Sequence, residues 1–208
     1  MSEAAVRRHE RNPDRTRRAI LDAAFRVIHR HGFQGMRLDE VVEATGLTKG
    51  ALYHHFPNKQ ALGYAVVDEI ISEMMHELWT RPLEDAGDPL QAIIDTLTGI
   101  AERMGEELTV LGCPLNNLAQ EMSPLDEGFR TRIDRVYSEW QASLERALDR
   151  ARHRGDLPVD ADTHRLASFI IASISGCIGL SKTAQDRELL RSCLHTLADI
   201  LAGLRRSG

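Results

Sequence analysis

The sequence predicts an all-α fold of about nine helices. Apolar residues recur every three or four positions along most of the 208-residue chain, and no segment alternates apolar with polar residues as a half-buried strand does. Aspartate, asparagine or threonine stands immediately before several of these apolar runs, as is typical of helix N-termini. A chain of this length is also long enough to bury a sizeable core.

Composition indicates a soluble protein with an aliphatic core, because 42% of residues are apolar, 27% are charged and only 5% are aromatic. No apolar run approaches about 18 residues, so no membrane-spanning helix is expected. The N-terminus lacks the apolar region of a secretory signal. Three widely spaced cysteines do not suggest a disulfide framework, which favours the reducing cytoplasm.

The formal net charge of −5 is unevenly distributed. Residues 1–60 carry a balance of +4, whereas residues 61–208 carry −9. The first segment can therefore attract an anion such as DNA, although arginines on a solvated helix would give the same count. We expect a DNA-binding domain over 1–60 and an effector-binding and dimerisation domain over 61–208.

The first domain is expected to contain three helices, and a fourth follows it. Pro13 and Asp14 begin the first helix and Gly32 ends it. The second spans Leu38 to Thr45 and the third Thr48 to Phe56. Asn58 caps a long fourth helix, whose expected buried stripe has one residue in every four: Leu62, Val66, Ile70, Met74 and Leu78.

The second domain is expected to begin at a helix capped by Asp88, with Pro89 at its first position and Met104 still on its buried face. Gly112 and Pro114 interrupt this pattern, and a short helix follows as far as Glu121. Ser123, Pro124 and Asp126 repeat the N-cap, first-position and third-position pattern at the start of a long helix that ends at Gly155. The last two helices are expected to start near Asp160 and Asp186.

The segment from Leu38 to Phe56 fits a helix-turn-helix. Gly46 supplies the permissive residue that a short turn between two steeply crossing helices needs. Leu47 fills the elbow, and the apolar side chains Val41, Leu52 and Phe56 face the first helix. Lys49, Gly50, Tyr53 and His54 are left on the outer side near the N-terminus of the third helix, as in a helix that reads the major groove.

The run Gly-Leu-Thr-Lys-Gly-Ala-Leu-Tyr-His-His-Phe, followed by Asn58, Lys59 and Leu62, resembles the TetR family of repressors. Val42 and Thr45 depart mildly from it, since the family usually has alanine there. The resemblance implies that Tyr53, His55 and Lys59 contact phosphates. It also implies that a second set lies near base edges and flanking backbone: Arg37, Thr48, Lys49, Gly50 and His54.

Several of these residues have alternative interpretations. Tyr53 would also suit a core aromatic with a satisfied hydroxyl, and His55 would suit a hydrogen bond between helices. The N-terminal arginines would suit backbone or minor-groove contacts or simple solvation. They are Arg7, Arg8, Arg11, Arg15, Arg17 and Arg18.

The second half resembles the family's effector-binding and dimerisation domain, and it carries no comparably specific motif. The resemblance implies a homodimer through the last two helices and a small-molecule effector. Expected cavity residues are Phe129, Ile133, Tyr137, Trp140, Phe169, Ile170 and Ser173, with polar groups from Asn116, Asn117 and Gln120. Ordinary core packing explains the apolar residues equally well, and the polar ones would also suit an exposed surface.

Cys113 supports a second hypothesis about release from DNA. It lies near the N-terminus of a short helix, where the helix dipole lowers a thiol pKa. Lys182, at the end of the helix that starts near Asp160, is expected to approach Cys113 and favour the thiolate further. Modification of Cys113 would then release DNA. The alternative is a small buried apolar residue.

No enzyme motif is present in the sequence: it has no phosphate-binding loop, dinucleotide fingerprint, H-E-x-x-H or G-x-S-x-G. We expect no metal, because His54 and His55 point about 100° apart on a helix. We also expect no cofactor. The sequence therefore predicts a DNA-binding transcriptional regulator, with a non-regulatory helical binding module or an enzyme lacking recognisable motifs as the alternatives.

Overall fold

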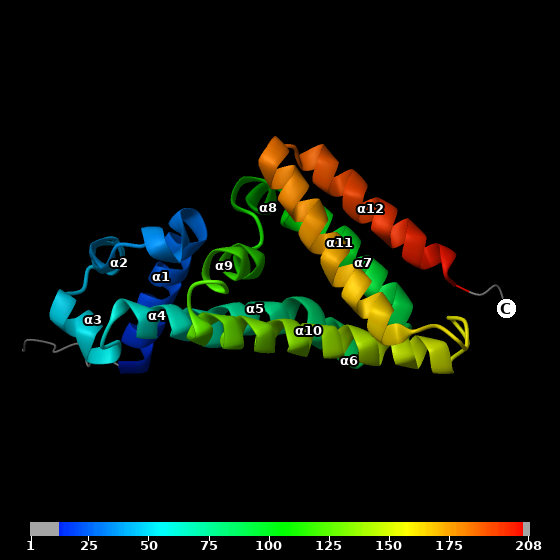
Figure 1. The fold of residues 1–208 in the computed structure, drawn as a ribbon, viewed down its shortest axis with the longest axis horizontal. Coiled ribbons are helices and arrows are strands. Elements are labelled where there is room, and N and C mark those ends of the chain that lie inside the picture. Colours follow the sequence, from blue (N-terminus) through cyan, green and yellow to red (C-terminus); the bar gives the residue numbers. More distant parts are fainter. Residues whose placement is uncertain (1–12, 206–208) are drawn as a thin grey trace, which may run out of the picture. The chain divides into compact units, whose positions relative to one another are not determined.

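The computed structural model describes residues 13–205 (Figure 1), and these residues form helices and connecting turns with no strand. The expected all-α fold is thus confirmed. The chain divides into two compact units, Met1–Val66 (unit 1) and Val67–Gly208 (unit 2). Arg7, Arg8 and Arg11, which were considered for DNA contacts, lie outside the described residues.

Unit 1 contains four helices, α1 (Pro13–Gly35), α2 (Leu38–Thr45), α3 (Lys49–His55) and α4 (Lys59–Ala65). Helix α1 packs against both α2 and α4. Its expected end at Gly32 appears as a kink rather than a stop, because Gly32 has a non-helical backbone (φ 75°, ψ 167°) and helical turns continue to Gly35. The buried core consists mainly of Ile20, Leu21, Ala24, Ile28, Met36, Val41, Leu52, Phe56 and Leu62.

The unit boundary lies six residues beyond the expected one at residue 60. Helix α4 packs against α1 and buries Leu62 and Gly63, so its turns belong to the first unit's core. The sequence pattern gave no sign of this division, because apolar residues continue without a break from α4 into the next segment.

Unit 2 begins with a run of helical elements that includes two π-helical segments. They are η1 (Val66–Ile71), α5 (Ser72–Met75), η2 (His76–Thr80) and α6 (Arg81–Glu84). The expected stripe is confirmed at Leu62, Val66 and Ile70, which are buried, whereas Met74 and Leu78 are only half-buried. A stripe one position later is buried throughout its length: Val67, Ile71, Met75, Trp79 and Leu83.

The π-helical segments explain why a strict four-residue repeat stays on one face. In an α-helix such a repeat drifts by about 40° per step. A π-helix has wider turns, with hydrogen bonds between residues i and i+5, and so reduces that drift. The stripe thereby keeps contact with the long helix α10 (Glu127–His153), which packs against α5, η2 and α6.

The remaining helices of unit 2 are α7 (Pro89–Arg103), α8 (Gly105–Leu111), α9 (Pro114–Met122), α11 (Thr163–Ala184) and α12 (Arg187–Gly203). Helices α7, α11 and α12 lie together in the green, orange and red part of Figure 1, and α12 contacts both of the others. The fifth expected helix is divided in two by a turn at Met104 (φ −110°, ψ −1°), which separates α7 from α8.

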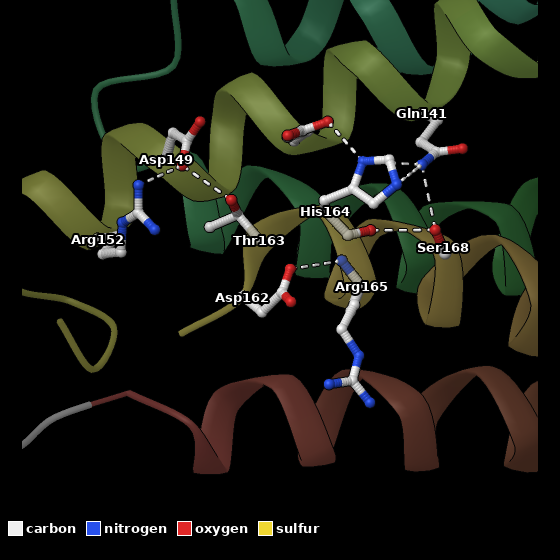
Figure 2. A network of polar contacts seen from close by, with 9 residues as sticks. Gln141, Asp149, Arg152, Asp162, Thr163, His164, Arg165 and Ser168 are labelled. Carbon is white, nitrogen blue, oxygen red and sulfur yellow. Dashed lines mark hydrogen bonds and ion pairs between the residues drawn. The ribbon is translucent and has the colours of Figure 1, made fainter. Parts of the chain in front are cut away.

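A polar network joins the end of α10 to the start of α11 (Figure 2). Asp149 accepts hydrogen bonds from Arg152 (2.8 Å) and from the buried Thr163 (2.9 Å). Asp162 caps α11 by accepting from the backbone N–H of Arg165 at 3.0 Å. These contacts fix where α11 begins, two residues after the expected Asp160.

Helix α11 is the one described helix that is long and apolar enough, by length and composition alone, to cross a membrane. No such segment was expected, because the sequence shows no unbroken apolar run; serine, threonine and glycine are interspersed in α11. Only a third of its apolar window is buried within this chain, so much of the helix presents an unpacked apolar surface.

Asp88 stabilises unit 2 through two roles. Its carboxylate caps α7 by accepting from Gln91 N–H (3.0 Å) and also pairs with both terminal nitrogens of Arg205 (2.9 and 3.1 Å). The hydrogen bonds from Arg205, and then the one from Gln91, hold the pKa of Asp88 below its ordinary value.

We therefore predict that Asp88→Ala lowers the free energy of unfolding by about 1–2 kcal/mol at pH 7 in urea denaturation. Because the folded-state pKa is lowered, this contribution is complete above the ordinary value of 3.8 and is lost as pH falls through the folded-state pKa. The control is Asp199→Ala, which changes an exposed aspartate on α12. Equal destabilisation of both variants would contradict the two roles of Asp88.

Candidate functional site

The turn between α2 and α3 is set by Gly46. This glycine ends α2 with a left-handed backbone (φ 65°, ψ 17°), and its N–H donates to the Glu43 carbonyl at 3.2 Å. Thr48 then caps α3, its hydroxyl accepting from the backbone N–H of Ala51 at 3.1 Å. Val41 and Leu52 are buried, as the sequence predicted, and hold the two helices in unit 1.

The outer face of α3 is exposed and polar. Thr48, Lys49, Gly50 and His54 are exposed, and Tyr53 is 48% exposed despite its size. This exposure excludes the interpretation of Tyr53 as a core aromatic. The face therefore carries exposed polar side chains along its length, with Lys49 in the first turn of α3 and His54 in the last.

His55 is less exposed than these residues. It is half-buried, its ring lies 6.5 Å from that of Phe56, and it lines a hollow of about 210 Å³ together with Thr16, Leu47 and His54. Leu47, expected to plug the elbow, thus borders this hollow. His55 occupies the edge of the α3 face rather than its centre.

Lys49 forms an ion pair with Asp39 on α2, with Nζ 2.6 Å from Oδ1. The hydrogen bond to Asp39 raises the pKa of Lys49, and the same bond lowers the pKa of Asp39. Lys49 is therefore firmly protonated. An exposed pair of this kind exchanges partners at little cost, so the ammonium stays available to another anion.

Lys59 and Arg37 flank the α3 face. Lys59 is the first residue of α4, after the N-cap Asn58, whose side chain accepts from Ala61 N–H at 2.7 Å. Its ammonium donates to the Gln34 carbonyl at 2.9 Å and lies 5.0 Å from the centre of the Phe33 ring. An ammonium group carries three N–H donors, so the hydrogen bond to Gln34 orients Lys59 and leaves N–H donors for another acceptor. Arg37 is exposed immediately before α2.

Among the described N-terminal arginines, Arg17 and Arg18 make contacts within unit 1. The Arg17 guanidinium lies 5.0 Å from the centre of the Phe56 ring, which ties α1 to the end of α3. Arg18 pairs with Asp22 one turn later at 3.0 Å. Arg15 is exposed.

A polar cluster lies inside unit 2, where α9, α10 and α11 meet. The Tyr137 hydroxyl donates to Asn116 Oδ1 at 3.4 Å and hydrogen-bonds with Ser175. Burial raises the pKa of Tyr137 far above its ordinary value, so the hydroxyl remains a neutral donor. Sequence reasoning missed Ser175, because it lies two positions from the expected Ser173 and only the direction of α11 brings it to Tyr137.

Cys113 lies beside this cluster, and the pKa of its thiol is shifted in the direction opposite to the expected one. Burial raises the pKa of Cys113 and outweighs the hydrogen bonds from the Leu115 and Asn116 backbone that lower it. Lys182, expected to favour the thiolate, instead donates to Asn117 Oδ1 at 3.2 Å. The prediction of a lowered thiol pKa was therefore wrong, because desolvation at this site exceeds the effect of the helix N-terminus.

The other expected cavity residues divide into three groups by their burial. Phe129, Ile133, Trp140 and Ile170 are buried. Trp140 stacks on Tyr137 with ring centres 6.2 Å apart, and Asn117 and Ser173 are half-buried. Phe169 and Gln120 are exposed, so the structure does not bring them to the cluster. Phe169 points outward because the buried face of α11 passes through Ile170 and Ile174.

Within residues 13–205, no three His, Cys, Asp or Glu side chains gather closely enough to hold a metal ion. The groups available for chemistry are therefore hydrogen-bond donors, cations and three free thiols, at Cys113, Cys177 and Cys193. On the surface of α3 these groups suit contact with a polyanion. In the interior of unit 2 they suit binding of a small polar molecule.

Two family models match the chain. Residues 20–66 match "Bacterial regulatory proteins, tetR family", and residues 87–197 match "Tetracyclin repressor-like, C-terminal domain". The chain is 28% identical over 193 residues to the HTH-type transcriptional repressor DhaR of Mycobacterium sp. strain GP1, covering 89% of this chain and 91% of DhaR. It is 29% identical to the A-factor receptor protein of Streptomyces griseus, covering 85% of this chain and 58% of that protein.

Solved structures share the fold. The regulatory protein TetR from Rhodobacter sphaeroides superposes with a TM-score of 0.79 at 25% identity, over 88% of this chain and 97% of that one. A TetR transcriptional regulator from Chloroflexus aurantiacus reaches 0.82 at 26% identity, over 95% and 100%. Together with the helix-turn-helix of unit 1, these matches show that the chain belongs to the TetR family and is a DNA-binding transcriptional regulator.

Proposed function

We propose that the protein is a repressor that binds a double-stranded operator as a homodimer and is released by a small molecule bound in unit 2. The DNA-binding unit is 1–66, which replaces the boundary at residue 60, and unit 2 is the effector-binding and dimerisation domain. The proposed DNA contacts are Arg37, Thr48, Lys49, Gly50, Tyr53, His54, His55 and Lys59. As a DNA-binding regulator it is expected to work in the bacterial cytoplasm.

The observation that carries this proposal is the exposed outer face of α3. Its buried side is anchored by Leu52 and by the Arg17–Phe56 contact, so Lys49, Tyr53 and His54 are not needed for folding. A helix held this way presents its N-terminal turn to the major groove. Lys49 and Lys59 supply charge for phosphates, and that charge makes binding salt-dependent.

The dimer is supported by the outer face of α11 and α12. Phe169 is 51% exposed and Leu180 60% exposed on one side of α11, and Ile200 is exposed on α12. Between them Gly176 and Gly179 leave open space where a side chain would stand, which permits close approach of a second helix. Two recognition helices are also needed to read half-sites about one DNA turn apart.

The effector is supported by the interior cluster of Tyr137, Asn116, Asn117 and Ser175. These half-buried groups offer donors and acceptors beside the Trp140 ring, which stacks on Tyr137, and a small-molecule site combines polar and apolar groups in this way. One relative is named as the A-factor receptor protein, which agrees with ligand control. Release through Cys113 modification is less favoured, because its raised pKa keeps the thiol protonated.

The test is a gel-shift assay with the DNA flanking the protein's own gene. We expect specific binding that weakens steeply as salt rises. In the same assay Lys59→Ala should weaken binding to all sequences alike and reduce the salt slope by about one unit. A complete lack of salt-sensitive DNA binding would revive the alternatives of a non-regulatory module or an enzyme.

Gly50→Ala separates DNA contact from folding. A Cβ at Gly50 would meet only Thr48 Oγ1, at 3.9 Å, so the protein itself accommodates it. Alanine should raise the free energy of unfolding by about 0.5 kcal/mol while weakening operator binding about 10-fold, because the methyl group separates helix and groove. Gly87→Ala, in open space outside α3, is the control and should leave binding unchanged. Unaltered operator affinity in Gly50→Ala would contradict close approach at this position.

The double variant Phe169→Asp, Leu180→Asp should convert the dimer to a monomer in sedimentation velocity. Desolvating these carboxylates against a second apolar face is costly, whereas both sites are already exposed in the single chain. Val159→Asp, at a loop residue that is also exposed, is the control. A variant that sediments as the wild-type dimer would place the interface elsewhere.

At pH 7.5 Cys113 of the folded protein should react with iodoacetamide at least about 10-fold more slowly than Cys113 of the urea-unfolded chain, because the thiolate is the reactive form. Mass spectrometry of tryptic peptides measures the rate for each cysteine. Reaction at or above the unfolded rate would restore the Cys113 switch, and loss of electrophile-induced DNA release in Cys113→Ser would support it further.

A further inference from the structure

A groove runs along unit 2 between α10 and the consecutive segments α5 and η2. Helices α5 and α10 lie side by side in Figure 1. Its volume is about 400 Å³, within the range of small-molecule sites. Its floor is apolar and includes Met75, Val136 and Trp140, and its rim includes His76, Arg135 and Arg146. The interior cluster around Asn116 is built instead from α9, α10 and α11.

Trp140 lines this groove and carries a buried, unsatisfied donor. Its side chain is 96% buried, and its indole N–H has no hydrogen-bond partner among the described residues. An indole nitrogen only donates, and leaving it buried without an acceptor is unfavourable. A ligand oxygen that reaches this N–H would therefore gain affinity.

The rim carries an excess of positive charge. Arg146 makes no ion pair within the part of the chain that the structure describes, and His76 makes none there either. Arg135 is shared between Asp68 in η1 at 2.7 Å and Glu139 at 3.9 Å. With Glu139 as the only carboxylate that lines the groove among these residues, two arginines face one acid. The groove therefore favours an anion.

We propose that this groove binds an amphipathic aromatic carboxylate, at a site separate from the interior cluster. The flat apolar part lies over Met75 and Val136, and the carboxylate meets Arg146 and Arg135. The Trp140 N–H donates to a ligand oxygen. This binding is independent of DNA contact by α3, so its failure and the failure of operator binding are distinguishable.

The ion pair between Arg135 and Asp68 should oppose ligand binding. A carboxylate in the groove competes with Asp68 for the same guanidinium. Asp68 lies in η1, two residues beyond the last residue of unit 1, and it is also held by Arg132 at 3.0 Å. Removing the Asp68 charge should therefore strengthen ligand binding, whereas removing the charge of Arg146 should weaken it.

Tryptophan fluorescence is a suitable readout, because the chain has two tryptophans and their rings lie 5.2 Å apart at this place. We expect biphenyl-4-carboxylate to give a saturable change with the full-length protein, and the neutral biphenyl-4-carboxamide to bind at least about 10-fold more weakly. Arg146→Gln should weaken carboxylate binding about 10-fold, and Asp68→Asn should strengthen it about 3-fold. Trp140→Phe should weaken it while Trp79 still reports.

Two controls locate the site. Arg130→Gln removes a cation from the same helix outside the groove, and Asn116→Ala alters the interior cluster; neither should change carboxylate binding. The proposal is overturned if no saturable response appears at millimolar carboxylate or if Arg146→Gln binds like wild type. It is also overturned if Arg130→Gln weakens binding equally, or if only Asn116→Ala does. Circular dichroism checks that each variant is folded.

Discussion

The orientation of the α3 face depends on one left-handed residue, Gly46. A φ of 65° costs most side-chain-bearing residues about 1 kcal/mol or more, and glycine adopts it freely. This backbone turns the chain within three residues from the end of α2 to the start of α3. Thr48 then closes the first turn of α3, and Leu52 and Phe56 secure its inner side. Because these residues hold the helix in place, the residues on its outer side are free for binding.

Features that depend on neighbouring residues could be predicted from the sequence. Thr48, Asn58 and Asp88 are N-caps as expected, because a cap needs only its own side chain and the next two or three N–H groups. Ser123, expected to cap the long helix α10, instead ends α9, and Asp126, expected inside the first turn, is the cap. The helix-turn-helix was predictable for the same reason. Its sequence signature combines a turn glycine, an N-cap residue and apolar residues at helical spacing within a single short segment.

Features that depend on distant packing could not be predicted. Beyond the π-helical segment η1, the buried positions that pack against α10 are Met75 and Trp79 instead of the expected Met74 and Leu78. The direction of α11 put Ser175 rather than Phe169 toward Tyr137. Likewise, the groove that Arg146 lines exists only because α5, η2 and α10 pack side by side.

Cys113 illustrates how two local effects compete. Its place before α9 favours the thiolate through two backbone N–H groups, and this part was visible in the sequence. The burial that opposes it comes from the surrounding fold, and burial prevails. In unit 2, therefore, the position of Cys113 at a helix N-terminus did not determine the pKa of its thiol. In unit 1 the exposed α3 face has no such opposing burial.

The central claim is that DNA is read by the outer face of α3. Hydrogen–deuterium exchange of the full-length protein, with and without a DNA fragment that it binds, tests this claim most directly. We expect DNA to slow exchange in residues 48–59 more than in any other described segment of unit 1. Unchanged exchange in residues 48–59, with protection appearing elsewhere in unit 1 instead, would contradict it.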